Sequence, residues 1–94
     1  IVETADISKE DLVIEIGPGL GTLTSYLLEK AGKVICIELD DRMIKILKDR
    51  FFMYENFEII NEDVLKELVT IKYNEYFEIY YSFNNSTYVY VLCE

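Results

Sequence analysis

Three glycines in this sequence recur at alternate positions just after a short apolar segment. Residues 15–21 read Glu-Ile-Gly-Pro-Gly-Leu-Gly, which places the glycines at Gly17, Gly19 and Gly21. Glycine lets the backbone turn tightly and lets a ligand approach without a Cβ in the way, and a helix that starts after such a turn offers free N–H groups. The segment therefore predicts a ligand-binding turn between a strand and a helix.

Two acidic residues follow later apolar segments. Glu38 lies roughly 20 residues after Gly17, where an acidic side chain can accept hydrogen bonds from both hydroxyls of a ribose. Asp63 follows segment 57–60 and suits the exocyclic amine of adenine, although it could instead cap a turn at Val64. Ligands bind outside the carboxyl ends of parallel strands, so we expect one shared site. The adjoining residues predicted to line it are Leu20, Leu39 and Val64.

These features indicate an adenosine-containing cofactor, for which nicotinamide dinucleotides and S-adenosylmethionine compete. A dinucleotide fingerprint reads G-x-G-x-x-G, whereas here the third glycine, Gly21, comes one residue early. Glu15 would repel a pyrophosphate, but it suits the cationic ammonium and sulfonium of S-adenosylmethionine, directly or through water. The residues therefore favour a methyltransferase over a dehydrogenase.

The elements that must position these residues alternate between strand and helix patterns. The apolar segments 11–16, 33–38 and 57–60 read as buried parallel strands. Strands that alternate with helices at this spacing predict a parallel sheet with right-handed crossovers, which is a doubly wound α/β fold. We expect the chain to form a single domain over residues 1–94.

Two helices are predicted between these strands. The first spans 20–30 and is terminated by Gly32. The second begins after an N-cap at Asp40 or Asp41. The apolar stripe of the first consists of Leu20, Leu23, Leu27 and Leu28. The buried face of the second consists of Met43, Ile44, Leu47 and Phe51. Beyond Val64 the pattern weakens into an irregular helix, two Tyr-rich strands at 76–83 and 88–93, and a turn between them.

Composition limits the partners of the chain. With 9 basic and 18 acidic residues among 94, the net charge is −9. Because nucleic-acid phosphates are bound by basic side chains, any nucleic acid would be bound mostly by parts outside this chain. Cys36 and Cys93 show no metal-ligand spacing and no His is present, which predicts buried thiols and no metal. No apolar run is long enough for a membrane span, and no signal peptide is visible. We expect an intracellular protein, cytoplasmic by default or organellar, and a fragment, because the chain starts at Ile1.

Three segments carry a resemblance to a known family. Segments 13–24, 34–43 and 61–65 contain the strings Glu-Ile-Gly-Pro-Gly-Leu-Gly-Thr-Leu-Thr, Ile-Glu-Leu-Asp and Asn-Glu-Asp-Val-Leu. Together they resemble the ribosomal RNA adenine dimethyltransferases, which include the 16S/18S dimethyladenosine transferases, the erythromycin-resistance methylases and mitochondrial transcription factor B. The resemblance covers residues 1 to about 66.

The resemblance implies a Rossmann-like class I S-adenosylmethionine-dependent methyltransferase lobe, here incomplete. The glycines would lie along the methionine part of the cofactor, Glu38 on the ribose and Asp63 on the adenine amine. The implied reaction is the N6,N6-dimethylation of adenines in ribosomal RNA of the small subunit. The fold also permits a cofactor-binding or RNA-assembly factor without turnover, and a dehydrogenase remains a third interpretation.

Two family features are missing from the sequence. A Gln-Asn-Phe-Leu-type segment that closes over the cofactor would precede residue 1. Family members also carry Asn-Leu/Ile-Pro-Tyr after the fourth strand, and no such string exists in this sequence. The nearest candidate is Asn85-Ser-Thr-Tyr88, in which Asn85 would take hydrogen bonds from the adenine N6 and Tyr88 would stack on the flipped base. Alternatively, residues 66–94 are an insertion, 88–93 is the fourth strand, and the catalytic loop lies beyond Glu94.

Overall fold

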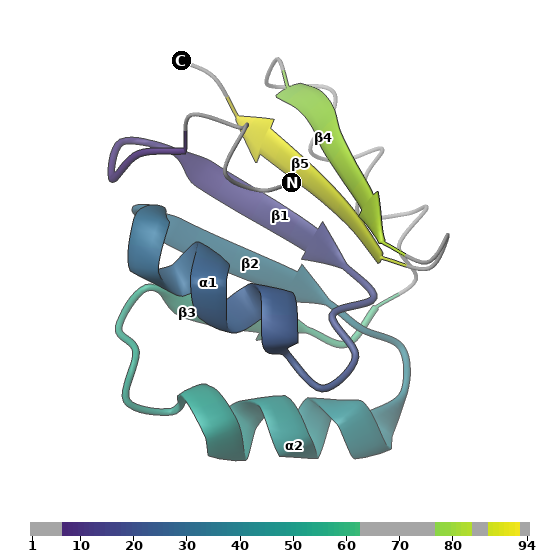
Figure 1. The fold of residues 1–94 in the computed structure, drawn as a ribbon. Coiled ribbons are helices and arrows are strands. Elements are labelled where there is room, and N and C mark those ends of the chain that lie inside the picture. Colours follow the sequence, from purple (N-terminus) through teal and green to yellow (C-terminus); the bar gives the residue numbers. More distant parts are fainter. Residues whose placement is uncertain (1–6, 63–76, 84–86, 93–94) are drawn as a thin grey trace.

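A computed structural model describes residues 7–62, 77–83 and 87–92, and of the last two segments it describes the backbone and the side chain of Val89. Within these described residues, five strands form one sheet of order β3-β2-β1-β5-β4, and two helices pack on it (Figure 1). In chain order the elements are β1 (Leu12–Ile16), α1 (Thr22–Lys30), β2 (Lys33–Ile37), α2 (Asp41–Phe51), β3 (Phe57–Ile60), β4 (Phe77–Phe83) and β5 (Thr87–Leu92).

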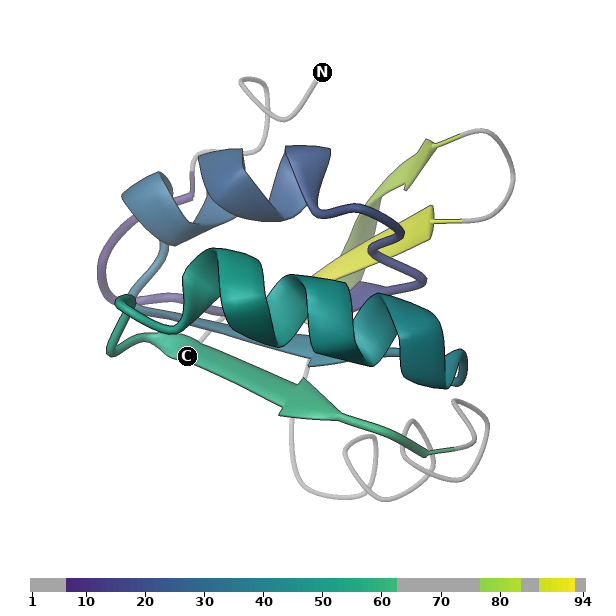
Figure 2. The same ribbon diagram turned by 90° about the horizontal axis from the view of Figure 1, so that it is seen from below.

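The first five elements form the predicted strand-helix alternation. β1 pairs in parallel with β2, and β2 pairs in parallel with β3. Both helices lie side by side on one face of this sheet, as Figure 2 shows. Short crossovers of this kind turn right-handed and return each strand to the same direction. The prediction of an α/β fold with parallel strands and helical crossovers is confirmed for this part of the chain, in which both described helices cover one face.

The C-terminal strands add antiparallel pairs to this parallel sheet. β5 pairs antiparallel with β1, and β4 pairs antiparallel with β5. Only three residues separate the end of β4 from the start of β5, whereas a parallel crossover needs a dozen or more. Both Tyr-rich segments are strands as expected, but they form a hairpin and make the sheet mixed.

The start of α1 also differs from the prediction. Gly21 adopts the left-handed φ of 90° and its N–H donates to the carbonyl of Pro18, so the helix begins at Thr22 and not at Leu20. Leu20 lies in the turn and is 59% exposed, which makes its assignment to the buried stripe wrong. Leu27 and Leu28 are buried, as the stripe predicts.

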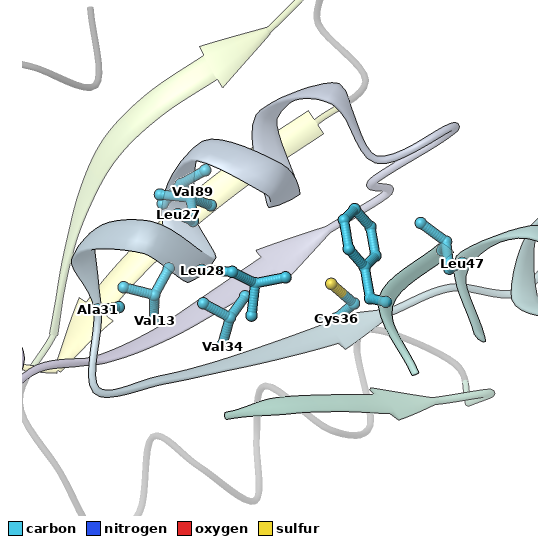
Figure 3. Close-up of a cluster of buried hydrophobic side chains, with 9 residues drawn as sticks. Val13, Leu27, Leu28, Ala31, Val34, Cys36, Leu47 and Val89 are labelled. Carbon is cyan, nitrogen blue, oxygen red and sulfur yellow. The ribbon is translucent and has the colours of Figure 1, made fainter. Parts of the chain in front are cut away.

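The main core lies between the sheet and the two helices (Figure 3). Side chains alternate along a strand, so Val13 faces the helices and Ile14 faces the opposite side of the sheet. The predicted buried face of α2 is confirmed at Ile44, Leu47 and Phe51, while Met43 is half-buried. The helix-side cluster consists of Val13, Leu27, Leu28, Ala31, Val34, Cys36, Leu47, Phe51 and Val89.

The two helices end in ways that fit their sequences. Asp40 caps α2 by accepting a hydrogen bond from the N–H of Arg42, and Lys48 and Arg50 in the last turn complement the helix dipole. The Asn56 side chain donates to the carbonyls of Leu28 and Ala31 at the end of α1. Within the described residues, no helix is long and apolar enough to cross a membrane.

Candidate functional site

The carboxyl ends of β1, β2 and β3 lie along one edge of the sheet, as the arrowheads in Figures 1 and 2 show. Backbone hydrogen bonds continue past the strands: the N–H of Gly17 donates to the carbonyl of Ile37, and the N–H of Glu38 donates to the carbonyl of Ile60, each at 3.0 Å. These bonds fix the three strand exits relative to one another. The predicted site residues on β1 and β2 therefore lie at a common edge.

The glycine turn needs its glycines for two different reasons. Gly17, Gly19 and Gly21 have φ values of 69°, 60° and 90°, a region that side chains disfavour. A Cβ on Gly19 would meet no atom within 4 Å, whereas a Cβ on Gly21 would lie 2.6 Å from the Phe51 ring. Gly19 thus borders open space, and Gly21 allows α2 to pack closely. The N-cap of α1 is Gly21, and within the described residues no side-chain hydrogen bond caps this helix.

Glu15, the predicted cation-binding residue, lies within the core beside this turn. Its side chain is completely buried, and its Oε1 accepts a hydrogen bond from the hydroxyl of Thr24 on α1. The thiol of Cys36 on β2 donates to the same oxygen at 3.5 Å. The other oxygen, Oε2, is buried without a hydrogen-bond partner in the described part of the chain.

The environment of Glu15 resists its ionisation. Burial raises the pKa of its carboxyl to about 7, although the hydrogen bonds from Thr24 and Cys36 oppose this change. Burial and the neighbouring Glu15 raise the pKa of the Cys36 thiol, which is free and buried as predicted. A buried carboxylate needs a donor or a cation on each oxygen, and Oε2 has the capacity to accept one from a ligand.

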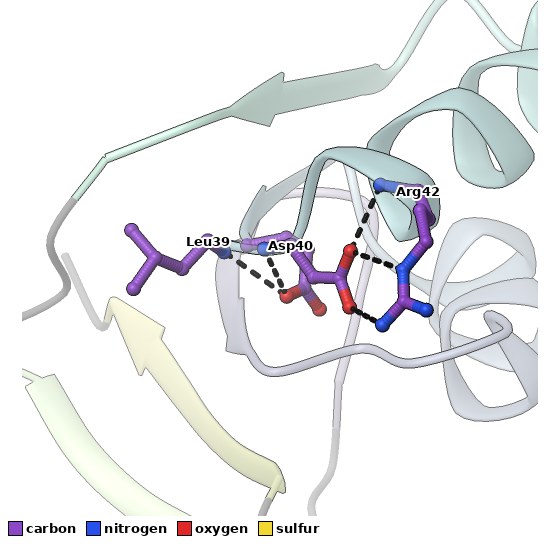
Figure 4. Close-up of polar contacts among 4 residues, drawn as sticks. Leu39, Asp40 and Arg42 are labelled. Atoms are coloured by element: carbon purple, nitrogen blue, oxygen red, sulfur yellow. Dashed lines mark hydrogen bonds and ion pairs between the residues drawn. The ribbon is translucent and has the colours of Figure 1, made fainter.

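Glu38, directly after β2, is held quite differently, by the turn in which Figure 4 labels Leu39 and Asp40. Its Oε2 accepts hydrogen bonds from its own backbone neighbours, the N–H groups of Leu39 at 3.0 Å and Asp40 at 2.9 Å. Its Oε1 has no partner in the described segments. The Arg42 guanidinium pairs with Asp40 at 2.9 Å and lowers the pKa of that carboxyl, so Arg42 is engaged with Asp40. Glu38 is therefore a partly exposed carboxylate that the backbone holds at Oε2.

Two leucines at this edge are exposed despite their apolar side chains. Leu39 is 70% exposed and Leu20 is 59% exposed. The carbonyl of Leu20 accepts a 2.6 Å hydrogen bond from Arg50, which ties the turn to α2. Exposed apolar side chains beside polar anchors are typical of sites that receive a flat apolar ring.

The third strand end is described as far as residue 62. The Asn61 side chain donates to Asp41 at 2.7 Å and links the exit of β3 to the start of α2. The predicted residues Asp63 and Val64 lie outside the described residues. Among those described, no group of three acidic or Cys side chains is arranged to hold a metal ion.

Of the predicted catalytic pair, Asn85 lies outside the described residues. Tyr88 is the second residue of β5, so the backbone here agrees with the alternative strand at 88–93, and the catalytic role of Tyr88 stays a prediction. Its backbone pairs with Ile16, the last residue of β1. Tyr88 therefore lies at the same sheet edge as the glycine turn.

Sequence reasoning missed Thr24, Cys36, Asn61 and Asp41 as supporting residues. Thr24 carried a usable signal, because it is a polar residue on the apolar side of α1 between Leu23 and Leu27. Cys36 lies two residues after Val34 on β2 and pairs with Glu15 across the sheet, so all three side chains face the helix side of the sheet.

Comparisons with known proteins place this arrangement in context. A model of the family described as ribosomal RNA adenine dimethylase matches residues 1–88. The chain is 58% identical over 66 residues to ribosomal RNA small subunit methyltransferase A of Alkaliphilus metalliredigens, an alignment that covers 70% of the chain and 23% of the relative. It is 54% identical over 78 residues to the protein of the same name from Clostridium botulinum, covering 83% of the chain and 27% of the relative.

A solved structure agrees with these relatives. The dimethyladenosine transferase from Plasmodium falciparum superimposes with a TM-score of 0.65 at 43% identity, over 69% of this chain and 24% of that one. The fold and its carboxyl edge are those of a Rossmann-like class I methyltransferase lobe. More narrowly, the chain belongs to the ribosomal RNA adenine dimethylase family. It spans about a quarter of the length of the curated relatives it matches.

Proposed function

We propose that the protein to which this chain belongs transfers methyl groups from S-adenosylmethionine to the N6 atoms of adenines in ribosomal RNA of the small subunit. The observation that carries the proposal is the buried Glu15 carboxylate, whose Oε2 lacks a partner in the described residues and which lies next to a turn of left-handed glycines. Family membership supplies the class of reaction.

The residues at the edge fit S-adenosylmethionine in charge and shape. Glu15 Oε2 would accept a hydrogen bond from the ammonium of the methionine part. The open space at Gly19 leaves room for that part beside the backbone, and Gly17 and Gly21 shape the turn. Glu38 Oε1 would accept hydrogen bonds from the ribose hydroxyls, because Oε2 already accepts from the N–H groups of Leu39 and Asp40. The residues proposed to contact the adenine are Leu20, Leu39, Asp63 and Val64.

When bound, the cofactor supplies an electrophilic methyl group. The lone pair of the target N6 is delocalised into the adenine ring, so the protein must hold this weak nucleophile in line with the methyl group. We assign this task to Asn85, whose side chain would accept hydrogen bonds from N6, and to Tyr88, which would stack on the extruded base. The backbone of Tyr88 beside Ile16 supports a position near the glycine turn.

The RNA partner must be held mostly by other parts of the protein. The chain carries a net charge of −9, and phosphate contacts require basic side chains. We propose that this lobe binds the cofactor and presents the methyl group, while contacts to the small ribosomal subunit come largely from outside it. A cytoplasmic location follows from such a substrate, with an organellar ribosome as the alternative.

The test uses the protein to which this chain belongs as the enzyme. Its substrate is small-subunit particles that lack this modification. Labelled S-adenosylmethionine should yield N6,N6-dimethyladenosine, identified by mass spectrometry of the digested RNA. Asn85→Ala should abolish the product, while Glu55→Gln, an exposed change at the opposite edge of the sheet, should leave it unchanged. The absence of methylated adenosine, or its appearance on large-subunit RNA alone, would contradict the proposal.

A further inference from the structure

We infer that Thr24 and Cys36 are positioning residues for the cofactor: they occupy Oε1 of Glu15 together and leave Oε2 as the oxygen that receives the ligand's ammonium. This inference rests on the proposed function. It concerns two side chains that would not touch the cofactor themselves and would act through the carboxylate between them.

The geometry joins three elements around one oxygen. Glu15 comes from β1, Thr24 from the first turns of α1, and Cys36 from β2. Glu15, Thr24 and Cys36 are completely buried. The Thr24 hydroxyl lies within hydrogen-bond distance of Glu15 Oε1, the Cys36 sulfur lies 3.5 Å from the same oxygen, and the sulfur and the hydroxyl are 3.9 Å apart.

Both donors act on the same oxygen, which makes the two oxygens of the carboxylate unequal. Oε1 accepts from a hydroxyl and a thiol, whereas Oε2 accepts nothing in the described part of the chain. A side chain held at one oxygen keeps its rotamer and therefore the direction of the other. Without these donors, the buried carboxyl would lose both its orientation and its stabilising hydrogen bonds.

The charges around the carboxylate explain why this support is needed. The titratable groups that act on this cluster are the Cys36 thiol and, through its effect on Cys36, the Glu38 carboxylate at the end of β2. Neither brings a positive charge, and no ion pair to Glu15 occurs among the described side chains. The hydrogen bonds from Thr24 and Cys36 lower the pKa of Glu15 and so favour the ionised form that a cation binds.

The test compares two ligands that differ in the ammonium. S-adenosylhomocysteine carries the amino-acid part, and methylthioadenosine lacks it. We would titrate both calorimetrically into the full chain, its Thr24→Val variant, which keeps the shape but removes the hydroxyl, and its Thr24→Ser variant, which keeps the hydroxyl. The same substitution Thr24→Val would be repeated in a Glu15→Gln background.

The expected result is selective. Thr24→Val should weaken S-adenosylhomocysteine binding about tenfold, leave methylthioadenosine binding within about twofold, and add nothing in the Glu15→Gln background. It should also move the pH midpoint of S-adenosylhomocysteine affinity upward, and Thr24→Ser should restore most of the affinity. Equal losses for both ligands, or an undiminished loss in the Glu15→Gln background, would overturn the inference.

Two further outcomes keep the test decisive. If Thr24→Val does not fold, the pair Cys36→Ala and Cys36→Ser addresses the same oxygen: the alanine should weaken only S-adenosylhomocysteine, and the serine, which retains a donor, should not. The reverse order would refute the inference. If the wild-type chain binds neither ligand, the proposed cofactor role fails and the inference falls with it, whereas binding with unselective losses refutes the inference alone.

Discussion

The carboxyl ends of β1 and β2 each present a glutamate to the same edge of the sheet, but they hold it in opposite ways. Glu15 is buried and is held by side chains from two other elements. Glu38 is partly exposed and is held by the backbone N–H groups of the next two residues. One carboxylate depends on the packing of the domain, and the other depends on a local turn.

The difference bears on what each carboxylate can do. A charge in the interior interacts strongly with a ligand charge because little water screens it, and the same burial makes its ionisation costly. A charge at the surface is screened, so its use lies in the geometry of its hydrogen bonds. We therefore assign charge recognition to the β1 end and hydroxyl recognition to the β2 end.

The largest effect is expected where the β1 end meets the core. Gly21→Ala would force a side chain into a left-handed residue and place its Cβ 2.6 Å from the Phe51 ring. We expect a loss of about 3 kcal/mol in the free energy of unfolding, measured by urea denaturation. Gly19→Ala, with no atom within 4 Å of its Cβ, should cost only about 1 kcal/mol, and equal losses would show that Gly21 is not packed against α2.

A second effect concerns the pH dependence of stability. Burial raises the pKa of Glu15 from 4.5 to about 7, so between these values the folded chain keeps a proton that the unfolded chain has released. The contribution of Glu15 to stability therefore falls as pH rises from about 4.5 to 7, by at most about 3 kcal/mol. Glu15→Gln should remove this decline, which is measured by comparing the free energy of unfolding of the variant and the wild type at several pH values. Glu38→Gln should leave the decline in place.

The β2 end should show its effect in ligand affinity. Glu38→Ala removes the acceptor proposed for the ribose hydroxyls, and we expect S-adenosylhomocysteine to bind roughly tenfold to a hundredfold more weakly. An analogue without the 2′-hydroxyl should lose less on the substitution than the parent ligand. If both ligands lost the same factor, Glu38 would support the turn and not the ribose.

The smallest effect is expected at the exit of β3. Asn61→Ala breaks the exposed 2.7 Å hydrogen bond to Asp41, which is worth about 1 kcal/mol or less. We expect about a threefold loss of affinity for adenosine-containing ligands, since the turn that follows β3 would be less fixed. Glu62→Ala, at an exposed neighbouring residue, serves as the control. An equal loss of affinity in this control would contradict the role assigned to Asn61.

Much of the edge could be predicted from the sequence because it depends on local rules. Apolar segments of strand length, the glycine turn and the Asp40 cap specify the first five elements directly. Glu38 follows from the spacing to Gly17 alone, and its backbone hydrogen bonds are local as well. Local geometry of this kind needs no knowledge of how distant elements pack.

The rest depends on contacts that spacing does not encode. Leu20 fits the helical stripe by period, yet the left-handed Gly21 delays the helix and leaves it exposed. The Glu15 cluster requires the packing of α1 against the sheet, and the hairpin of β4 and β5 follows from a three-residue link and not from strand pattern. Position 88 was ambiguous because its neighbours suit either a loop or a strand.

The most direct test of the proposed division of roles is a calorimetric titration of the full chain with S-adenosylmethionine and, separately, with NAD. We expect S-adenosylmethionine to bind at a single site, with binding weakened by both Glu15→Gln and Glu38→Ala, and NAD not to bind. Binding of NAD in place of S-adenosylmethionine, or S-adenosylmethionine binding that neither substitution weakens, would contradict the assignment of these two carboxylates.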